Sequence, residues 1–286
     1  LKKVKTITSR TLGFQFAPLL NAAGRMEDAD MAVRFLLSKG EKEAETIAKK
    51  LDSVNYQRRD KEGLMLKEAL DLIEKNKQGP AIILVSSNFH EGINGIVATR
   101  LVERFYKPVL ILSKCGIKLK GSGRSIPELH LKDALSDSSD LLDRFGGHSA
   151  AAGCSLKLEN LQAFRERFFA FCKKNIPEST EQNLQIDGKI EFSKLTNLFL
   201  EQLDRLQPFG EGNPEPIFSL STPELPFKKI KNKHLKCEIN DDVEIIGWNQ
   251  AESFSIKAPT KLAVNLCFNE FRGKRKIQLT IQDTFE

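Results

Sequence analysis

Between residues 80 and 175 the sequence alternates short apolar runs of strand length with amphipathic stretches of helix length. Residues 81–86 and 108–113 are aliphatic runs, which is typical of strands buried on both faces. This alternation predicts an α/β domain in which helices flank a mixed sheet. The other predicted strands cover residues 118–126 and 151–156, and the predicted helices cover residues 95–105, 131–145 and 160–174.

A different pattern stands on each side of this region. Residues 1–78 are predicted to be a helical connecting segment, because apolar side chains fall on one helical stripe over residues 29–76. The α/β domain then covers residues 79–176. The polar stretch 175–183 predicts a linker. Residues 184–286 predict one helix, at 192–206, and then short strands separated by glycine and asparagine turns, which is the pattern of a small β-barrel.

The composition narrows the class of protein. The chain has 286 residues, enough for two domains. It contains no apolar run long enough to span a membrane and no signal peptide, so we expect a cytoplasmic protein. Its five cysteines are scattered, without a C-x-x-C pair, and predict reduced thiols rather than a disulfide or zinc framework. Because the chain begins at Leu1 rather than at Met, we expect an amino-terminal part to be missing.

The net charge of +6 fits a polyanionic partner, and it fits lysines kept for solubility equally well. The stretches that could carry chemistry must therefore be judged one by one.

Two of these stretches lie near predicted helix starts. Asn21 and Arg25 belong to L-N-A-A-G-R, where the forked guanidinium of the arginine suits phosphate. The alternative is a helix-capping loop with a solvated arginine. His90, in H-E-G-I-N-G, follows a buried strand, at a junction whose backbone N–H groups favour anions. It could equally cap the helix or pack in a polar pocket.

Two further stretches combine glycine with a basic side chain. Ser122, Gly123 and Arg124 lie in G-S-G-R-S, which predicts a phosphate cradle as readily as an exposed hairpin. In R-F-G-G-H-S-A-A-A-G, the pair Gly146–Gly147 brings the backbone close to a ligand. His148 follows among small residues, where little packing needs an imidazole, and this favours a functional role for it.

The carboxy-terminal region adds two basic clusters close to aromatic residues. Basic hairpins beside aromatic rings suit single-stranded nucleic acid, because the charges follow the backbone while the rings stack on bases. The alternative is that most of the aromatic residues Phe268, Phe271 and Trp248 belong to the barrel core. The candidate contacts are Lys229, Lys231, Lys233, Arg272, Lys274 and Arg275.

A catalytic centre is not recognisable. The sequence has four histidines, none adjacent to another, and no dense cluster of Asp and His of the kind that a two-metal hydrolytic site needs. It also lacks a phosphate-binding P-loop and a Ser-His-Asp signature. We therefore predict no metal ligands in this chain.

Taken together, the motifs resemble a known family. L-N-A-A-G-R-M, H-x-G-I-x-G-I-V-A-x-R-L, G-S-G-R-S-I-P and R-F-G-G-H-x-A-A-A-G occur in this order in the RecJ family of single-strand-specific exonucleases, within the DHH phosphoesterase superfamily. L-Q-P-F-G-E-G-N-P-E-P-I-F and N-E-F-R-G-K-R-K-I-Q-L are similar to the entry and the closing hairpin of the OB-fold of this family. The resemblance covers about residues 13–283.

The resemblance implies a division of labour. An amino-terminal DHH domain, absent here, holds two Mn²⁺ or Mg²⁺ ions that activate water, and this chain supplies an α/β DHH-associated domain followed by an OB-fold β-barrel. Ser122 and Arg124 would bind the 5′ phosphate or adjacent backbone, with Arg25 on a nearby phosphate. His148 would lie by the scissile phosphate, and His90 would line the same cleft.

The expected activity is 5′→3′ hydrolysis of single-stranded DNA by the intact protein, with no activity of this part alone and no metal bound by it. The expected partners are single-stranded DNA and a single-strand-binding protein or a helicase. Two alternatives stay open. One is another DHH-superfamily phosphodiesterase, acting on short oligonucleotides or cyclic dinucleotides. The other is a standalone single-strand-binding module.

Overall fold

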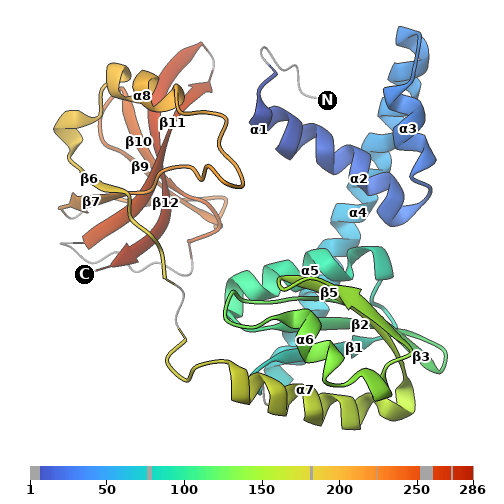
Figure 1. The fold of residues 1–286 in the computed structure, drawn as a ribbon. Helices are drawn as coiled ribbons and strands as arrows, with labels where there is room; N and C mark the ends of the chain where they lie inside the picture. The colour runs from blue at the N-terminus through green and yellow to red at the C-terminus, as the bar shows by residue number, and fades with distance from the viewer. Residues whose placement is uncertain are drawn as a thin grey trace. The chain divides into compact units, whose positions relative to one another are not determined.

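The structure is a computed structural model that describes residues 7–75, 79–180, 183–223, 225–251, 260–271 and 273–285. The chain divides into two compact units, Leu1–Gln182 and Asn183–Glu286, and the division falls inside the polar stretch 175–183. Each unit is drawn in Figure 1 and is described here by itself.

Helices form the first part of unit 1. The long helix α4 buries a stripe of apolar side chains spaced three to four residues apart, including Met65, Ala69 and Ile73. The helix α2 has a proline in its first turn, where the missing N–H group costs nothing. Asn21 and Arg25 therefore lie on a helix, and not in the helix-capping loop that was the alternative for this stretch. The elements are α1 (Ser9–Thr11), a π-helical turn (Leu12–Phe16), α2 (Ala17–Met26), α3 (Asp30–Leu36) and α4 (Glu41–Lys75).

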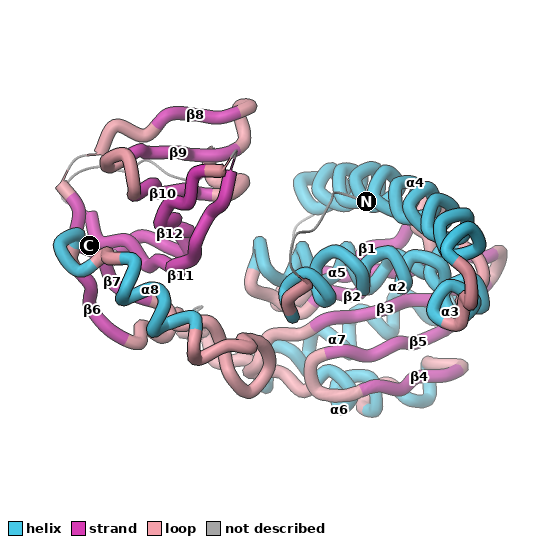
Figure 2. Tube along the Cα trace, turned by 90° about the horizontal axis from the view of Figure 1, so that it is seen from above, coloured by secondary structure: helices cyan, strands magenta, loops and turns pink. Residues whose placement is uncertain are grey.

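The described strands of unit 1 form one mixed sheet, as predicted, in the order β1-β2-β3-β5-β4 (Figure 2). Strands β1 and β2 are parallel and are joined by the crossover helix α5 (Glu91–Phe105), whereas the other pairs are antiparallel. The strands are β1 (Ile82–Ser86), β2 (Val109–Cys115), β3 (Lys118–Arg124), β4 (Arg144–Gly147) and β5 (Ala151–Lys157).

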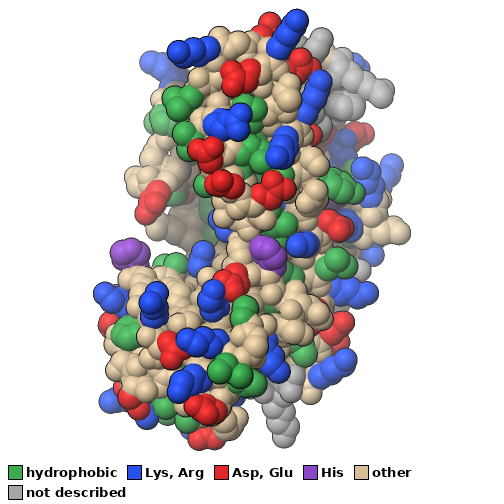
Figure 3. Space-filling view, turned by 90° about the vertical axis from the view of Figure 1, so that its right-hand side faces the viewer, with side chains coloured by type: hydrophobic (Ala, Val, Ile, Leu, Met, Phe, Trp, Pro, Cys, Tyr) green, Lys and Arg blue, Asp and Glu red, His purple; other side chains and the backbone are tan. Residues whose placement is uncertain are grey.

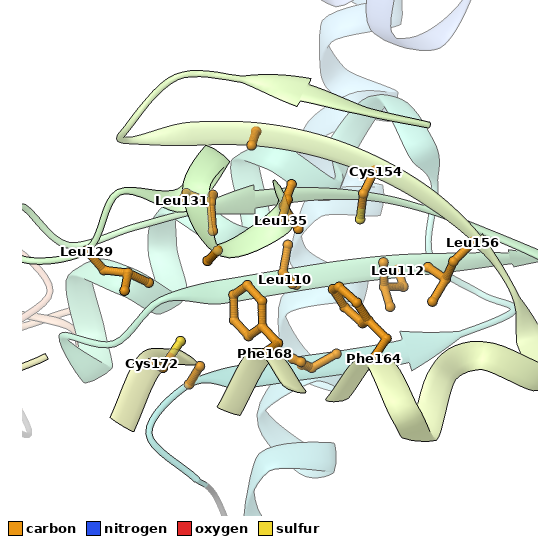
Figure 4. Close-up of a cluster of buried hydrophobic side chains, with 14 of the residues drawn as sticks. Leu110, Leu112, Leu129, Leu131, Leu135, Cys154, Leu156, Phe164, Phe168 and Cys172 are labelled. Atoms are coloured by element: carbon orange, nitrogen blue, oxygen red, sulfur yellow. The ribbon is translucent and has the colours of Figure 1, made fainter. Parts of the chain in front are cut away.

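Helices cover the two faces of this sheet unequally. On one face, α6 (Leu131–Ser136) and α7 (Leu161–Asn175) pack on β2, β3 and β5, and the rings of Phe164 and Phe168 are fully buried (Figure 4). On the other face, α4 and α5 pack on β1 and β2. On that second face Ala151, Gly153 and Ser155 of β5 are only partly buried. The sheet face on which α5 lies is therefore not covered by a helix over β5, and this part is called the open face below.

Two predictions inside unit 1 need correction. Residues 131–145 are not one helix: α6 ends at Ser136, a 3-10 turn (Ser139–Leu141) follows, and β4 begins at Arg144. Pairing with β5 overrides the helical spacing of the local sequence. The helix α5 also begins at Glu91, four residues before the predicted start.

The described strands of unit 2 form a sheet in the order β6-β7-β11-β12-β10-β9-β8. The predicted helix 192–206 is split into a 3-10 turn (Phe192–Lys194) and α8 (Asn197–Asp204), whose first turn is capped by the Thr196 hydroxyl, which accepts from the Phe199 N–H at 3.2 Å. The strands are β6 (Gly188–Ile190), β7 (Phe218–Thr222), β8 (Lys228–Ile230), β9 (His234–Glu238), β10 (Val243–Gly247), β11 (Thr260–Phe271) and β12 (Lys274–Phe285).

The short strands β6 and β8, which the sequence pattern did not predict, form the two edges of this sheet. No pairing between them is present among the described residues, so the predicted barrel is not closed there. A core of aliphatic side chains from both ends of the sheet packs under α8.

None of the described helices is long and apolar enough to cross a membrane. All five cysteines are free thiols; Cys154, Cys172 and Cys237 are buried, and Cys115 is exposed.

Candidate nucleic-acid-binding site

Strand pairing brings two of the predicted motifs onto the open face of the first sheet. Ser122 lies opposite Gly153 and Arg124 lies opposite Ala151, while Gly153 also pairs with Gly146 on its other side. Directly paired residues project to the same face of a sheet. The alternate residues Leu119, Ala152 and Cys154 belong to the core under α6 and α7. Ser122, Arg124 and Gly146 therefore share the face on which α5 lies.

Residues 121–124 form the end of strand β3 in the middle of the sheet, and neither a loop nor an exposed hairpin. The Arg124 side chain is partly buried against α5, and its Nη1 donates to the Gly123 carbonyl at 2.8 Å. Burial lowers the pKa of Arg124, and the positive charge of Arg25 lowers it further. The two guanidinium groups are therefore close enough to repel each other.

Arg25 reaches this face from α2. Its Nη1 donates to the Gly92 carbonyl at 3.2 Å, in the first turn of α5. The two helices touch closely here, because a β-carbon at Gly92 would lie 2.0 Å from the Arg25 carbonyl oxygen. Asn21 is exposed one turn before Arg25 on α2, so its side chain lies on the same side of the helix. Among the described residues, neither Arg25 nor Arg124 has a carboxylate partner.

His148 lies at the end of the same face. Its N–H donates to the Ala151 carbonyl at 2.8 Å, and Ala151 pairs with Arg124, so His148 and Arg124 flank one residue of β5. The His148 side chain is exposed. The preceding Gly147 has a φ of 143° and leaves no room for a β-carbon, which would lie 2.3 Å from the Ala151 carbonyl oxygen. Glycine is therefore required there to place His148.

Three predicted contacts are placed differently. A β-carbon at Gly123 would point into the core, 2.5 Å from Leu110 Cδ2, so Gly123 can meet a ligand only through its backbone. Gly147, which is packed against β5, can likewise meet a ligand only through its backbone. His90 is the N-cap residue of α5, although its side chain makes no capping hydrogen bond, and it lines a separate pocket on the side of α4 together with Lys61, Met65 and Glu68 among others. Burial, and then the charge of Lys61, lower the pKa of His90.

The open face also contains a cavity that the sequence did not predict. It encloses about 370 Å³ and is lined by Glu91, Asn94, Lys120, Gly121, Ser122, Arg144, Phe145, Gly153, Cys154 and Ser155. Lys120, Ser155 and Arg144 form one cross-strand row. The polar residues that alternate with apolar ones along β3 and β5 were the signal for this surface. The surface was not predicted because the strand order, which places β5 between β3 and β4, is not visible in the sequence.

In unit 2 the predicted basic residues differ in exposure and in the contacts that they make. Lys229, Lys231, Lys233 and Lys274 are exposed, and Lys231 lies in a tight turn with a φ of 50°. The Arg275 guanidinium is engaged, since it lies 3.4 Å from the centre of the Phe268 ring and 3.4 Å from Glu201 Oε1. Arg272 lies outside the described residues.

Trp248, one of the three aromatic residues of which most were expected in the barrel core, is 50% exposed. It lines a groove of about 480 Å³ together with Lys236, Lys274 and Lys276 and the carboxylates of Glu238 and Glu244. The ring of Phe268 is packed against the core, as predicted, and the Phe271 side chain lies outside what the structure describes.

Charge as a whole does not locate a ligand. On the face of the molecule in Figure 3, Lys and Arg side chains are interspersed with Asp and Glu side chains. The part of the chain that the structure describes contains no group of three or more His, Cys, Asp or Glu side chains that could hold a metal ion. The described residues therefore do not fit a divalent metal, and no chemical step can be assigned to one here.

Comparison with known proteins assigns both units to domain families. The DHHA1 domain matches residues 78–174, and the RecJ OB domain matches residues 186–283. Relatives over almost the whole chain are the single-stranded-DNA-specific exonuclease RecJ of Dickeya dadantii, 34% identical over 96% of the chain, and that of Bacillus subtilis, 35% identical over 96%. The chain spans 51% and 36% of these two relatives.

A solved structure shows the same fold. The crystal structure of RecJ in complex with Mn²⁺ from Thermus thermophilus matches 96% of this chain and 41% of that protein, with a TM-score of 0.82 and 28% identity. A second structure of the same protein contains Mg²⁺. The order of motifs, the domain matches and this fold agree, and the chain corresponds to the carboxy-terminal part of the RecJ family, a DHHA1 domain followed by a RecJ OB domain.

Proposed function

We propose that this chain is the DNA-holding part of a single-stranded-DNA exonuclease, and that the open face of the DHHA1 sheet binds the phosphate at the 5′ end of the strand. Arg25, Ser122 and Arg124 bind this phosphate, and His148 lies beside the phosphodiester bond that is cleaved. In this proposal, the metal ions that activate water are held by residues outside this chain.

The observation that carries the proposal is the pair of guanidinium groups on this face. Arg25 comes from α2 and Arg124 from β3, they repel each other, and no described carboxylate compensates either charge. A phosphate between them would remove the repulsion and supply acceptors for charge-assisted hydrogen bonds. Ser122, one cross-strand row away from Arg124, adds a hydroxyl donor.

The RecJ OB domain supports a substrate longer than a dinucleotide. Its groove combines the half-exposed Trp248 ring with Lys274 and Lys276, whereas Lys236 is paired with Glu238 and Glu244 of the same groove. A ring of this kind stacks on any base while the ammonium groups of Lys274 and Lys276 follow the backbone. A phosphodiesterase for cyclic dinucleotides would not need such a groove.

The test is binding of matched oligodeoxynucleotides with and without a 5′ phosphate to the 286-residue chain, measured by fluorescence anisotropy. We expect tighter binding of the phosphorylated strand and a steep loss of affinity with salt, because Arg and Lys release counterions from the DNA. Arg124→Ala should remove the preference for the 5′ phosphate, a loss of roughly tenfold for one charged hydrogen-bonding group.

The matched control is Arg104→Ala, which removes an exposed guanidinium at the other end of α5. It should lower the affinity for both strands slightly and equally. If Arg124→Ala behaves like this control, the phosphate does not lie at Arg124 and the proposal is wrong.

A further inference from the structure

The cavity on the open face extends beyond the proposed phosphate site. Three cross-strand rows follow one another along the sheet: Arg124 with Ala151, then Ser122 with Gly153 and Gly146, then Lys120 with Ser155 and Arg144. The middle row presents almost no side-chain volume, whereas the outer rows carry cations. The four residue steps from Lys120 to Arg124 span about 13 Å along the strand, which is the length scale of one nucleotide.

The protein's own packing does not explain the two glycines of the middle row. No described atom lies within 4 Å of a β-carbon built at Gly146, and a β-carbon at Gly153 would meet only the Gly121 carbonyl oxygen, at an ordinary 3.5 Å. By contrast, β-carbons at Gly121 and Gly123 would lie 2.2 and 2.5 Å from leucine side chains. Folding requires the latter pair, so the hollow at Gly146 and Gly153 has another reason.

Polar groups with unused hydrogen-bonding capacity line the cavity. Asn94 is 1% exposed; its Nδ2 donates to Ser113 Oγ at 2.8 Å, while its buried Oδ1 accepts no hydrogen bond from the part of the chain that the structure describes. A buried amide oxygen without a donor is costly unless a ligand supplies one. Arg144 forms no ion pair with the described residues, so its guanidinium is available as a donor.

We propose that this cavity is a nucleoside subsite that holds the sugar and base of the nucleotide whose phosphate lies at Arg25 and Arg124. The sugar passes over Gly153 and Gly146, where no side chain obstructs it. The base reaches Arg144, which donates to its ring or carbonyl acceptors, and Asn94, whose Oδ1 accepts from an exocyclic amine. The volume of about 370 Å³ lies within the range of small-molecule sites. This inference rests on the proposed function, because it takes its phosphate from the same site.

The chemistry of these groups predicts which nucleotides fit. Adenine, cytosine and guanine each carry an exocyclic amine close to a ring acceptor, so they can satisfy Asn94 and Arg144 together. Thymine has carbonyl oxygens in place of an exocyclic amine, and its ring N3–H lies between two of these oxygens, which repel Asn94 Oδ1. Thymine therefore pairs with Asn94 less well than the other three bases, and the site discriminates against it.

The experiment compares three probes on the 286-residue chain by calorimetry: inorganic phosphate, dTMP and dAMP. We expect dAMP to bind at least tenfold more tightly than phosphate and several-fold more tightly than dTMP. Gly153→Val, which fills the hollow with a residue that suits a strand, should abolish the gain of dAMP over phosphate while leaving phosphate affinity and the thermal midpoint unchanged.

Asn94→Leu tests the base contact, and Asn55→Leu is its matched control, since Asn55 is 3% exposed on α4 and does not line the cavity. Asn94→Leu should remove the preference for dAMP over dTMP, and Asn55→Leu should retain it. Equal affinity of the wild-type chain for phosphate and dAMP, or full retention of dAMP affinity in Gly153→Val, overturns the nucleoside subsite while the phosphate site stands. Failure of all three probes to bind overturns both.

Discussion

The guanidinium group of Arg124 lies directly against Gly95 of α5, and a β-carbon at Gly95 would be 2.9 Å from Arg124 Nη2. The helix therefore approaches the strand closely only because residue 95 has no side chain. This contact holds the guanidinium on the open face, where the charge of Arg25, which reaches the first turn of α5 from α2, also acts on it.

Gly95→Ala should separate stability from binding. Alanine in a helix interior is favoured over glycine by about 1 kcal/mol, and the colliding atom belongs to the end of a flexible side chain, so we expect the free energy of unfolding not to fall. The displaced Arg124 guanidinium should weaken binding of a 5′-phosphorylated oligonucleotide several-fold. Urea unfolding and anisotropy measure the two effects, and unchanged affinity would contradict the assigned position of the phosphate.

Gly92→Ala, unlike Gly95→Ala, should lower the free energy of unfolding. A β-carbon at Gly92 would lie 2.0 Å from the Arg25 carbonyl oxygen, which is backbone and cannot swing aside, so α2 and α5 must separate. We expect a loss of about 1–3 kcal/mol in the free energy of unfolding. The control is Gly63→Ala in α4, where no described atom lies within 4 Å of the new β-carbon and a gain of about 0.5–1 kcal/mol is expected.

Glu62 of α4 pairs with Arg58 on the same helix and joins α4 to α5 through Arg100. The buried carboxylate accepts from Arg58 Nη1 at 2.7 Å and from Arg100 Nε at 2.6 Å. Glu62→Gln leaves the Arg58 guanidinium, which is 12% exposed, without its charged partner. We expect a loss of about 1–3 kcal/mol in unfolding free energy. Glu45→Gln, which breaks the exposed pair with Lys49, should have no measurable effect.

The stability of unit 2 should depend on pH through Glu244. Burial alone would raise the pKa of this carboxyl, but hydrogen bonds from Asn269, Lys236 and Gln278, and the charge of Lys236, outweigh burial and lower the pKa below its ordinary value of 4.5. A lowered pKa means that the folded state favours the carboxylate. The stabilisation is therefore present above pH 4.5 and is lost as the pH falls through the folded-state pKa.

Glu244→Gln makes this dependence measurable. We expect the variant to be less stable than the wild type by about 1.5–3 kcal/mol at neutral pH. The difference should shrink as the pH falls below 4.5, because the protonated glutamic acid then resembles glutamine. Calorimetry between pH 7 and pH 3 follows the difference. A constant difference over this range would show that the charge of Glu244 contributes nothing.

The chain by itself should bind DNA without cutting it. Its described residues hold no cluster of metal-ligating side chains, so Mn²⁺ should neither bind with micromolar affinity in calorimetry nor release nucleotides from single-stranded DNA. Metal-dependent hydrolysis by the pure chain, removed by His148→Ala, would place the catalytic centre within these residues.

The sequence by itself determined the class of the fold. Apolar runs and helical stripes predicted the strands β1, β2 and β5 and the helices α4 and α7, because these elements bury a regular set of side chains along their own length. The ordered motifs determined the family, which the domain matches confirm. Strand β4 was not predicted, and its first two residues were assigned to a helix, because an exposed edge strand containing two glycines has no apolar alternation to identify it.

Only the tertiary structure decided which of the candidate residues share a surface. Arg25 meets Arg124 because Gly92 lets α2 touch α5, and Arg144 joins Lys120 because β5 pairs with both of their strands. His90, although it lies in a motif of the same family, faces α4 instead. Periodicity reports how each residue is buried within its own element. The pairing of strands and the close approach of helices depend on residues far apart in the chain, and no local pattern contains that information.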